Sequence, residues 1–361
     1  MSGPVLIMAG GTGGHVFPAL ALARLLRERS LEVVWLGTAR GLESRVIPAE
    51  GIPLEQLSIG GLRGKGALTW LAAPFRLARA LWQALAVMRR RRPALVVGLG
   101  GFVTGPGGIA AWLTHRPLLI HEQNAIAGFT NRCLAHLARQ VLEAFPNSFG
   151  REVHARLIGN PVRSDISALP APASRFAGRT GPIRILVIGG SQGAARLNQV
   201  VPFALKRLSG WLSFDVRHQS GERWLEAGRE AYARAQVRAD VRPFIEDMSE
   251  AYAWADLVIC RAGALTVSEL AAVGVGAILV PFPNAVDDHQ TANAQYLVRE
   301  GAALLVLDRD LNPERLANEL QRLCAGRGRL LAMAERARLL ARPRAGEELA
   351  ASCLELMRRA A

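Results

Sequence analysis

The chain contains two copies of one local pattern, in which an apolar strand runs into a glycine-rich turn and the start of a helix. The first copy reads VLIMAGGTGGH over residues 5–15, and the second reads RILVIGGSQGA over residues 184–194. Such a turn joins a buried parallel strand to a helix in doubly wound α/β domains. Its repetition therefore predicts two such domains in one chain.

Both halves continue the same alternation of short apolar strands with helical stretches. The first helix is expected near residues 18–29, and a second-half helix from Ala194. The further strands are expected at residues 32–36, 95–98, 117–121 and 140–144 in the first half, and at 214–218, 256–260, 277–281 and 302–306 in the second. Parallel strands with helical crossovers produce this pattern.

The stretch between the halves, residues 160–182, is rich in proline, alanine and serine and has the composition of a linker or a domain boundary. A length of 361 residues also favours two domains. We predict an α/β fold of two Rossmann-like doubly wound parallel-sheet domains that face a cleft, residues 1–162 and 163–340. Residues 341–361 are expected to contain a helix that packs back on the N-terminal domain.

The net charge of +14 is concentrated in the first half of the chain. Residues 1–160 carry 18 Lys and Arg against 8 Asp and Glu, and no acidic residue occurs between Glu55 and Glu122. Such a surface suits nucleic acid, anionic lipid or a phosphorylated substrate. An arginine-rich sequence bias explains the scarcity of lysine, but it does not explain the missing acids.

The N-terminus and the cysteines exclude other classes. No basic segment precedes the first apolar strand, so no signal peptide is expected. No apolar run reaches the roughly 18 residues of a spanning helix. The four cysteines form no CxxC pair, which indicates neither a zinc site nor a disulfide framework. We expect a protein that is soluble or attached to a membrane only at its surface.

The glycine turns are suited to a diphosphate, because backbone N–H groups at a helix N-terminus can face an anion. A third glycine-rich segment, GLGGFVTGPGG, lies at residues 98–108. None is a GxGxxG or P-loop fingerprint, and the second strands end in Leu-Gly-Thr and His-Gln-Ser without the acid that an NAD enzyme needs. The sequence therefore argues against a dehydrogenase.

Polar residues at the expected strand ends are candidates for the chemistry. His15 could accept a proton from an attacking hydroxyl, or merely cap its turn. The run His121–Asn124 could bind sugar hydroxyls, or be an ordinary polar loop. Ser268 and Glu269 are expected in the first turn of a helix, where Glu269 could bind a ribose diol or complement the helix dipole. Asp287 and Asp288 could suggest a metal, although an acidic loop is usually just solvated.

Residues 68–88 are apolar on more sides than a surface helix needs. One stripe is formed by Leu71, Phe75, Ala78, Trp82 and Leu85, and a second by Trp70, Leu77, Leu81 and Met88. Arg76 and Arg79 lie between them, and an arginine run follows at 89–92. This arrangement predicts insertion at an anionic lipid interface. The alternative is that the domain core buries both stripes; the segment matches no nucleic-acid-binding module.

Eight motifs occur in a specific order: GGTGGH, GGFVTGPGG, HEQNAIAGFTNR, GNPVR, GGSQGA, HQSG, ICRAGALTVSEL and PFPNAVDDHQTANA. Together they resemble the MurG family of peptidoglycan glycosyltransferases, from about residue 5 to residue 301. Thr104 and Ala262 stand where that family usually has serine. The resemblance implies the glycosyltransferase B fold, with the donor held mainly by the second domain.

The same resemblance implies roles for individual residues. Donor contacts would come from Thr12, Gly13, Gly14, Asn124, Arg163, Ser191, Ile245, Ala264, Leu265, Thr266, Val267, Ser268, Glu269 and Gln290. Arg163 and Ser191 would face the diphosphate, Ile245 would contact uracil through its backbone, and Glu269 would bind the ribose. Asn124 and Gln290 would bind the sugar. His15 matches a residue that serves as the base or binds the acceptor phosphate.

The implied reaction is inverting transfer of N-acetylglucosamine from UDP-N-acetylglucosamine to the C4 hydroxyl of undecaprenyl-diphospho-N-acetylmuramoyl-pentapeptide. No cofactor is expected, although a divalent cation could assist UDP release. The expected location is peripheral, on the cytoplasmic face of the bacterial inner membrane, near other cell-wall and division proteins and without nucleic acid. The alternatives are a glycosyltransferase acting on a neutral glycerolipid and a non-catalytic nucleotide-sugar-binding scaffold.

Overall fold

The computed structural model describes residues 3–60, 73–190, 193–283 and 288–359. The chain divides into two compact units. Unit 1 comprises Met1–Pro161 together with Pro343–Ala361, and unit 2 comprises Val162–Arg342. The sequence placed these boundaries at 162/163 and 340/341, within one or two residues of those found in the structure.

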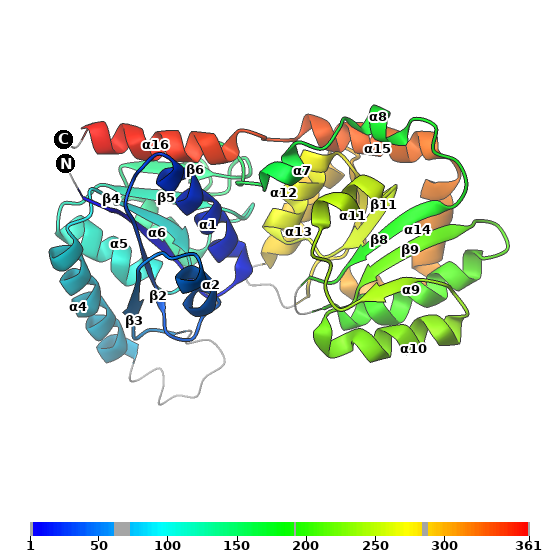
Figure 1. Cartoon of the computed structure of the whole chain (residues 1–361), viewed down its shortest axis with the longest axis horizontal. Helices are drawn as coiled ribbons and strands as arrows, with labels where there is room; N and C mark the ends of the chain where they lie inside the picture. The colour runs from blue at the N-terminus through cyan, green and yellow to red at the C-terminus, as the bar shows by residue number, and fades with distance from the viewer. Residues whose placement is uncertain (1–2, 61–72, 191–192, 284–287, 360–361) are drawn as a thin grey trace. The chain divides into compact units, whose positions relative to one another are not determined.

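Unit 1 is built on a parallel sheet with the strand order β3-β2-β1-β4-β5-β6-β7. The strands are β1 (Val5–Ala9), β2 (Val33–Thr38), β3 (Leu54–Leu57), β4 (Leu95–Gly100), β5 (Leu118–Glu122), β6 (Gln140–Glu143) and β7 (Arg156–Leu157). The helices are α1 (Gly13–Glu28), α2 (Glu43–Ala49), α4 (Ala73–Arg91), α5 (Thr104–Leu113), α6 (Phe129–Ala135) and α16 (Ala345–Arg359) (Figure 1).

Alternation along β1 explains how its sheet is covered on both faces. Val5 and Ile7 belong to a core with α1 and α16, whereas Leu6 and Met8 belong to a core with α4, α5 and α6. Successive side chains of a strand point to opposite faces, so a continuously apolar strand needs helices on both. In Figure 1 the red helix α16 runs along unit 1, where it packs on α1.

Unit 2 repeats the plan with the strand order β10-β9-β8-β11-β12-β13, again all parallel. The strands are β8 (Ile183–Ile188), β9 (Phe214–Gln219), β10 (Asp240–Arg242), β11 (Leu257–Cys260), β12 (Gly276–Leu279) and β13 (Ala303–Leu305). The helices are α7 (Ser164–Ser167), α8 (Pro172–Phe176), α9 (Ala195–Leu208), α10 (Leu225–Ala235), α11 (Met248–Trp254), α12 (Ala264–Val273), α13 (His289–Val298), α14 (Pro313–Cys324) and α15 (Arg327–Leu339). The prediction of two doubly wound parallel-sheet units is confirmed.

The structure corrects two local expectations. Residues 160–182 contain the boundary between the units, as expected, but the segment is not a free linker, because α7 and α8 bury Ile166 and Phe176 in unit 2. The first helix begins at Gly13 rather than near Pro18, because the missing N–H of a proline removes only one helical hydrogen bond. His15 therefore lies in the first turn of α1.

Candidate active site

The glycine turn of unit 1 leads from β1 into α1 at the carboxyl-terminal edge of the sheet. Gly11 has φ +91°, and Thr12 is the extended N-cap residue of α1. The Thr12 carbonyl accepts the N–H of His15 at 3.1 Å. Thr12, Gly13, Gly14 and His15 therefore share the helix N-terminus, where backbone N–H groups and the helix dipole favour an anion.

The ring of partly buried His15 lies against the end of β4. A Cβ atom on Gly100 would lie 2.8 Å from His15 Cδ2 and 2.9 Å from its Nε2, so only glycine leaves room for the ring. A Cβ atom on Gly101 would lie 2.4 Å from the Gly10 carbonyl oxygen. The start of the glycine-rich segment 98–108 thus allows β4 to approach the first turn, while Gly105–Gly108 lie within α5.

Glu43, at the start of α2, is a completely buried carboxylate that the sequence analysis missed. Its Oε2 accepts the N–H of Gly11 at 3.0 Å. Its Oε1 accepts the N–H of Thr38 at 2.9 Å and the Thr38 hydroxyl at 2.8 Å. Because Thr38 ends β2, this one side chain joins the glycine turn to the neighbouring strand. An acid at the start of a helix gave no sequence signal for that role.

The structure corrects the interpretation of the run 121–124 as four sugar-binding side chains. His121, Glu122 and Gln123 are buried and bond within unit 1. Glu122 accepts from the backbone N–H of Asn124 at 2.9 Å and from its amide at 3.1 Å. Burial lowers the pKa of His121, and its ring bonds to the Gly159 carbonyl. Only Asn124, which Glu122 orients, is partly exposed to solvent.

The glycine turn of unit 2 follows β8 and packs against the end of β9. Ser191 lies outside the described residues. Gly193 has φ +73°, and a Cβ atom on it would lie 2.2 Å from the Ser220 carbonyl oxygen. That carbonyl accepts from the Asn198 amide at 3.1 Å. The turn therefore packs directly on the strand end that the sequence identified as His-Gln-Ser.

A buried histidine holds this support in place. His218 Nε2 lies 2.9 Å from Asn198 Oδ1, and its Nδ1 lies 2.9 Å from the Tyr232 hydroxyl. Because the Asn198 amide nitrogen donates to Ser220, its Oδ1 must accept, so His218 carries its proton on Nε2 and accepts from Tyr232. Burial lowers the pKa of His218 to about 3. The residue is therefore a neutral structural link.

The backbone of Ile245 is already engaged within unit 2. Its N–H donates to Gln219 Oε1 at 2.9 Å, and its side chain is buried. A uracil contact through that N–H would require the Gln219 side chain to move, whereas a contact through the Ile245 carbonyl would not. The uracil contact of Ile245 stays a prediction.

Helix α12 carries most of the predicted nucleotide contacts, Ala264, Leu265, Thr266, Val267, Ser268 and Glu269. Ala264 and Val267 are buried, and the Ser268 hydroxyl donates to the Ala264 carbonyl at 2.9 Å. Ser268 and Glu269 lie in the second turn of the helix, not in the first as expected. The helix-dipole explanation for Glu269 is weaker there, since the dipole effect falls off after the first turn.

Glu269 is joined to two other elements of unit 2. Its Oε2 accepts from the hydroxyl of Tyr252 on α11 at 3.0 Å. Burial raises the pKa of Glu269, although the Tyr252 hydrogen bond and the charge of Arg163 oppose that shift. Arg163 precedes α7, is half exposed, and lies 3.8 Å from Asp165. Glu269, which is predicted to bind the ribose, and Arg163, which is predicted to bind the diphosphate, are thus close enough to interact electrostatically.

Gln290 lies in the first turn of α13, which follows β12 in the chain. Its Oε1 accepts the N–H of Phe282 at 2.8 Å, which fixes the side chain at the start of α13. Asp288 has φ +52° and accepts from the Thr291 hydroxyl at 2.7 Å; Asp287 lies outside the described residues. Within the described ranges, no three His, Cys, Asp or Glu side chains form a potential metal-binding cluster.

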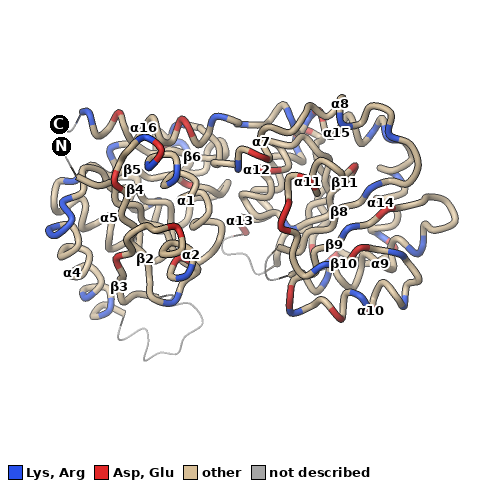
Figure 2. Tube along the Cα trace, in the orientation of Figure 1, with Lys and Arg blue, Asp and Glu red and all other residues tan. Residues whose placement is uncertain are grey.

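The candidate membrane helix is exposed where the sequence places its first stripe. Phe75 is 80% exposed and Trp82 is 70% exposed. Arg76 and Arg79 are also exposed, whereas Leu71 lies outside the described residues. Figure 2 shows basic segments along α4. The core contacts come from Ala80, Ala84, Val87 and Met88, so the alternative that both stripes are buried is wrong for the described part of the helix.

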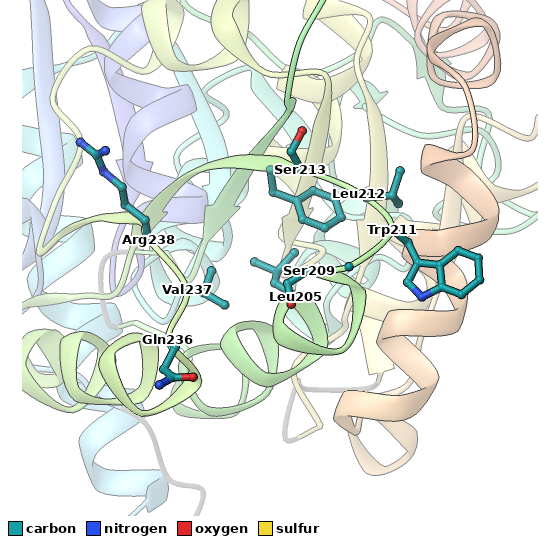
Figure 3. Close-up of a pocket in the computed structure, with 10 residues that line it drawn as sticks. Leu205, Ser209, Trp211, Leu212, Ser213, Gln236, Val237 and Arg238 are labelled. Atoms are coloured by element: carbon teal, nitrogen blue, oxygen red, sulfur yellow. The ribbon is translucent and has the colours of Figure 1, made fainter.

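A hollow of about 500 Å³ in unit 2 lies away from these residues (Figure 3). Its lining includes Trp211 and Leu212, which precede β9, and Phe214, the first residue of β9. Val237, which precedes β10, also lines it. It is therefore at the amino-terminal edge of the sheet. Ligands of doubly wound folds bind at the opposite edge, where the glycine turn lies, so this hollow is not the donor site.

Comparisons with known proteins agree with this architecture. Residues 5–143 match the glycosyltransferase family 28 N-terminal domain, and residues 184–349 match its C-terminal domain. The crystal structure of Acinetobacter baumannii MurG superposes with a TM-score of 0.88 at 43% identity, covering 98% of this chain and 99% of that one. The calicheamicin glycosyltransferase CalG4, at 17% identity and a TM-score of 0.70 over both whole chains, shares the fold alone.

Two curated relatives are similar over nearly the whole chain. Both are named UDP-N-acetylglucosamine–N-acetylmuramyl-(pentapeptide) pyrophosphoryl-undecaprenol N-acetylglucosamine transferase. The protein from Alkalilimnicola ehrlichii is 59% identical over 98% of this chain and 99% of its own, and that from Marinobacter nauticus is 59% identical over 97% and 96%. The two parallel-sheet units and their glycine turns thus define a two-domain glycosyltransferase. More narrowly, the chain belongs to the MurG family.

Proposed function

We propose that this chain transfers N-acetylglucosamine from UDP-N-acetylglucosamine to the C4 hydroxyl of undecaprenyl-diphospho-N-acetylmuramoyl-pentapeptide, with inversion at the anomeric carbon. The observation that carries the proposal is 59% identity over almost the full length of relatives that bear this activity in their names. The matched region covers 98% and 97% of this chain and therefore spans both units. A neutral glycerolipid acceptor has no comparable support.

The proposed step needs one base and stabilisation of one leaving group. The acceptor oxygen attacks the anomeric carbon, the bond from that carbon to the β-phosphate oxygen breaks, and UDP departs with the electron pair. We assign the acceptor proton to His15, which lies in the first turn of α1 with its ring against the end of β4. Arg163 and the glycine turn before α9 would stabilise the charge on UDP, with no metal required.

The proposed donor contacts divide between the units. In unit 1, Thr12, Gly13, Gly14 and Asn124 are assigned to the donor. In unit 2, the ribose is assigned to Glu269 and the sugar to Gln290, while Ser191 keeps its predicted diphosphate role. Hydrogen bonds from ribose hydroxyls to a carboxylate are charge-assisted, which makes Glu269 the strongest single determinant among these contacts.

Sugar transfer with labelled UDP-N-acetylglucosamine and a short-chain lipid-linked muramoyl-pentapeptide tests the proposal directly. Diacylglycerol serves as the competing acceptor in a parallel reaction. We expect a β-linked disaccharide product only with the muramoyl substrate. Product only with diacylglycerol would support the glycerolipid enzyme, and UDP-sugar binding without any product would support the scaffold.

We also propose peripheral attachment to the anionic cytoplasmic face of the bacterial inner membrane, near other cell-wall and division proteins. No helix in the described ranges is long and apolar enough to span a bilayer. The support is the exposed apolar and basic surface of α4, with Phe75 and Trp82 beside Arg76 and Arg79. Aromatic side chains with flanking arginines favour an anionic lipid interface.

A further inference from the structure

Tyr252 is a buried phenol whose hydroxyl meets the carboxylate of Glu269. It belongs to α11, a helix capped by Asp247, whose side chain accepts the N–H of Glu250 at 2.8 Å. Tyr252 is only 1% exposed, and its hydroxyl lies 3.0 Å from Glu269 Oε2 on α12. A buried tyrosine hydroxyl usually requires a partner, and here that partner is the residue assigned to the donor ribose.

The direction of this hydrogen bond follows from the surroundings. Burial and the charge of Glu269 raise the pKa of Tyr252 far above its usual value, so the phenol keeps its proton and donates. Burial, with a smaller contribution from Asp165, raises the pKa of Glu269, while the Tyr252 bond and Arg163 lower it. Burial, with a smaller contribution from the charge of Glu269, raises the pKa of Cys260 on β11, which stays a neutral thiol. Tyr252 thus favours the ionised form of Glu269.

We propose that Tyr252 is a positioning residue for donor selection, which fixes the Glu269 carboxylate so that it accepts from both hydroxyls of a ribose and discriminates against a 2′-deoxyribose. The proposal rests on the proposed function, which assigns the ribose to Glu269. An ionised carboxylate has about four lone-pair sites. Tyr252 occupies one on Oε2, which sets the plane of the group and leaves Oε1 for the diol.

The expected size of the discrimination follows from the charge on the acceptor. Removing the 2′-hydroxyl deletes one hydrogen bond to an ionised group, which corresponds to roughly tenfold to hundredfold weaker binding. The preference should disappear when Glu269 is protonated, because a neutral carboxyl no longer accepts from two hydroxyls at full strength. Since burial raises the pKa of Glu269, that loss should begin above the usual carboxyl range.

The test is calorimetric binding of UDP and 2′-deoxy-UDP from pH 5 to pH 8 to the full chain and to Tyr252→Phe. Without the donated bond, the acid limb of UDP binding, which is the loss of UDP affinity with falling pH, should begin at higher pH, and the preference for UDP should fall at the acid end of the range and recover at the alkaline end. The matched control is Tyr296→Phe, which deletes a tyrosine hydroxyl bonded to the Leu340 carbonyl in the same unit. It should leave the limb and the preference unchanged.

A second measurement does not depend on the folding of Tyr252→Phe. Incorporating 3-fluorotyrosine at all three tyrosines makes the phenol a stronger donor, so the acid limb should shift to lower pH. An unchanged limb in both experiments, or equal losses of UDP and 2′-deoxy-UDP affinity at every pH, overturns the positioning role. Failure of the unmodified chain to bind UDP would instead overturn the proposed function, so the two failures are distinguishable.

Discussion

Replacing Glu43 with Gln is the most direct test of how unit 1 supports its glycine turn. Both carboxylate oxygens face backbone N–H groups: Oε2 accepts from Gly11 and Oε1 from Thr38. A glutamine has one acceptor oxygen and one NH₂ group, so either orientation of its amide places a donor against a donor. The substitution keeps the volume of the side chain but replaces one acceptor oxygen with an NH₂ donor.

The expected destabilisation can be estimated from this geometry. One hydrogen bond to a charged group is lost, and one buried N–H is left without an acceptor, which together cost about 3 kcal/mol. A unit of this size loses roughly 2–4 °C in melting temperature per kcal/mol, so the shift should be on the order of 6–12 °C. Hydrogen exchange with peptide-level readout should show faster exchange in β1, α1 and α2 than in unit 2.

Glu50→Gln is the matched control, because Glu50 directly follows the same helix and pairs at the surface with Arg24 at 2.5 Å. A surface ion pair contributes at most about 1 kcal/mol. Calorimetry and hydrogen exchange on both variants decide the outcome. The bridging role assigned to Glu43 is wrong if the free energy of unfolding of Glu43→Gln lies within about 0.5 kcal/mol of that of the unmodified chain, or if the two variants lose equal stability.

The other predictions concern catalysis, pH and membrane binding. His15→Ala should keep UDP affinity by calorimetry while turnover falls about 10²- to 10⁴-fold, and retained turnover would remove His15 as the base. Burial lowers the pKa of His218 to about 3, below its unfolded value of about 6.5, so only the unfolded chain gains this proton as the pH falls between those values. Stability should therefore fall by up to about 1.4 kcal/mol per pH unit from this group, and urea unfolding of His218→Gln should lack that slope; an equal slope in both would contradict the assignment. Phe75→Glu with Trp82→Glu should weaken sedimentation with anionic liposomes without changing the thermal unfolding curve, whereas unfolding would indicate a buried role.

The periodic features of the fold were predictable, because strand burial leaves a direct trace in sequence. The continuously apolar β1 requires helices on both faces, and the structure provides them. The short strand β10 was missed: it has three residues, and only Val241 is buried. The residues 160–182 do contain the boundary between the units, but composition shows neither the burial of Ile166 nor that of Phe176 beyond it.

The candidate site was likewise predictable from the sequence only in part. Turns rich in glycine are visible in sequence because the backbone conformation demands the residue type, as at Gly11 and Gly193, both with positive φ. Side-chain partners that lie far apart in the chain leave no such trace. The bond from Gly11 to Glu43 spans 32 residues, and that from Tyr252 to Glu269 spans 17. Only the three-dimensional structure identifies these acceptors and donors.

The helix starts of the chain fall into two groups that bear on where anions bind. In α11 and α14 the N-cap side chains, Asp247 and Asn312, accept a backbone N–H from the first turn. In α1, α9 and α12, as far as the described residues extend, the N-cap residues Thr12, Ala194 and Gly263 make no side-chain cap, as is also true of α5, α6, α10, α13 and α15. Among the uncapped helices, α1 and α9 follow the glycine turns, and α12 carries most of the predicted nucleotide contacts.

An uncapped helix start leaves first-turn backbone N–H groups without a side-chain acceptor, which costs free energy. A bound anion offsets that cost, because free donors at a helix N-terminus favour negative charge. The turns before α1 and α9 are instead supported from within: Glu43 accepts from the first, and the second packs on the Ser220 carbonyl held by Asn198. Support from inside the unit fixes the backbone while leaving the outer donors for a diphosphate. Introducing an aspartate cap at Gly263, which is partly exposed and has room for a Cβ atom, should therefore stabilise α12 but weaken UDP binding, since the new carboxylate competes with the nucleotide for the same N–H groups. Stronger UDP binding in a stabilised Gly263→Asp variant, measured by calorimetry, would contradict this division of roles.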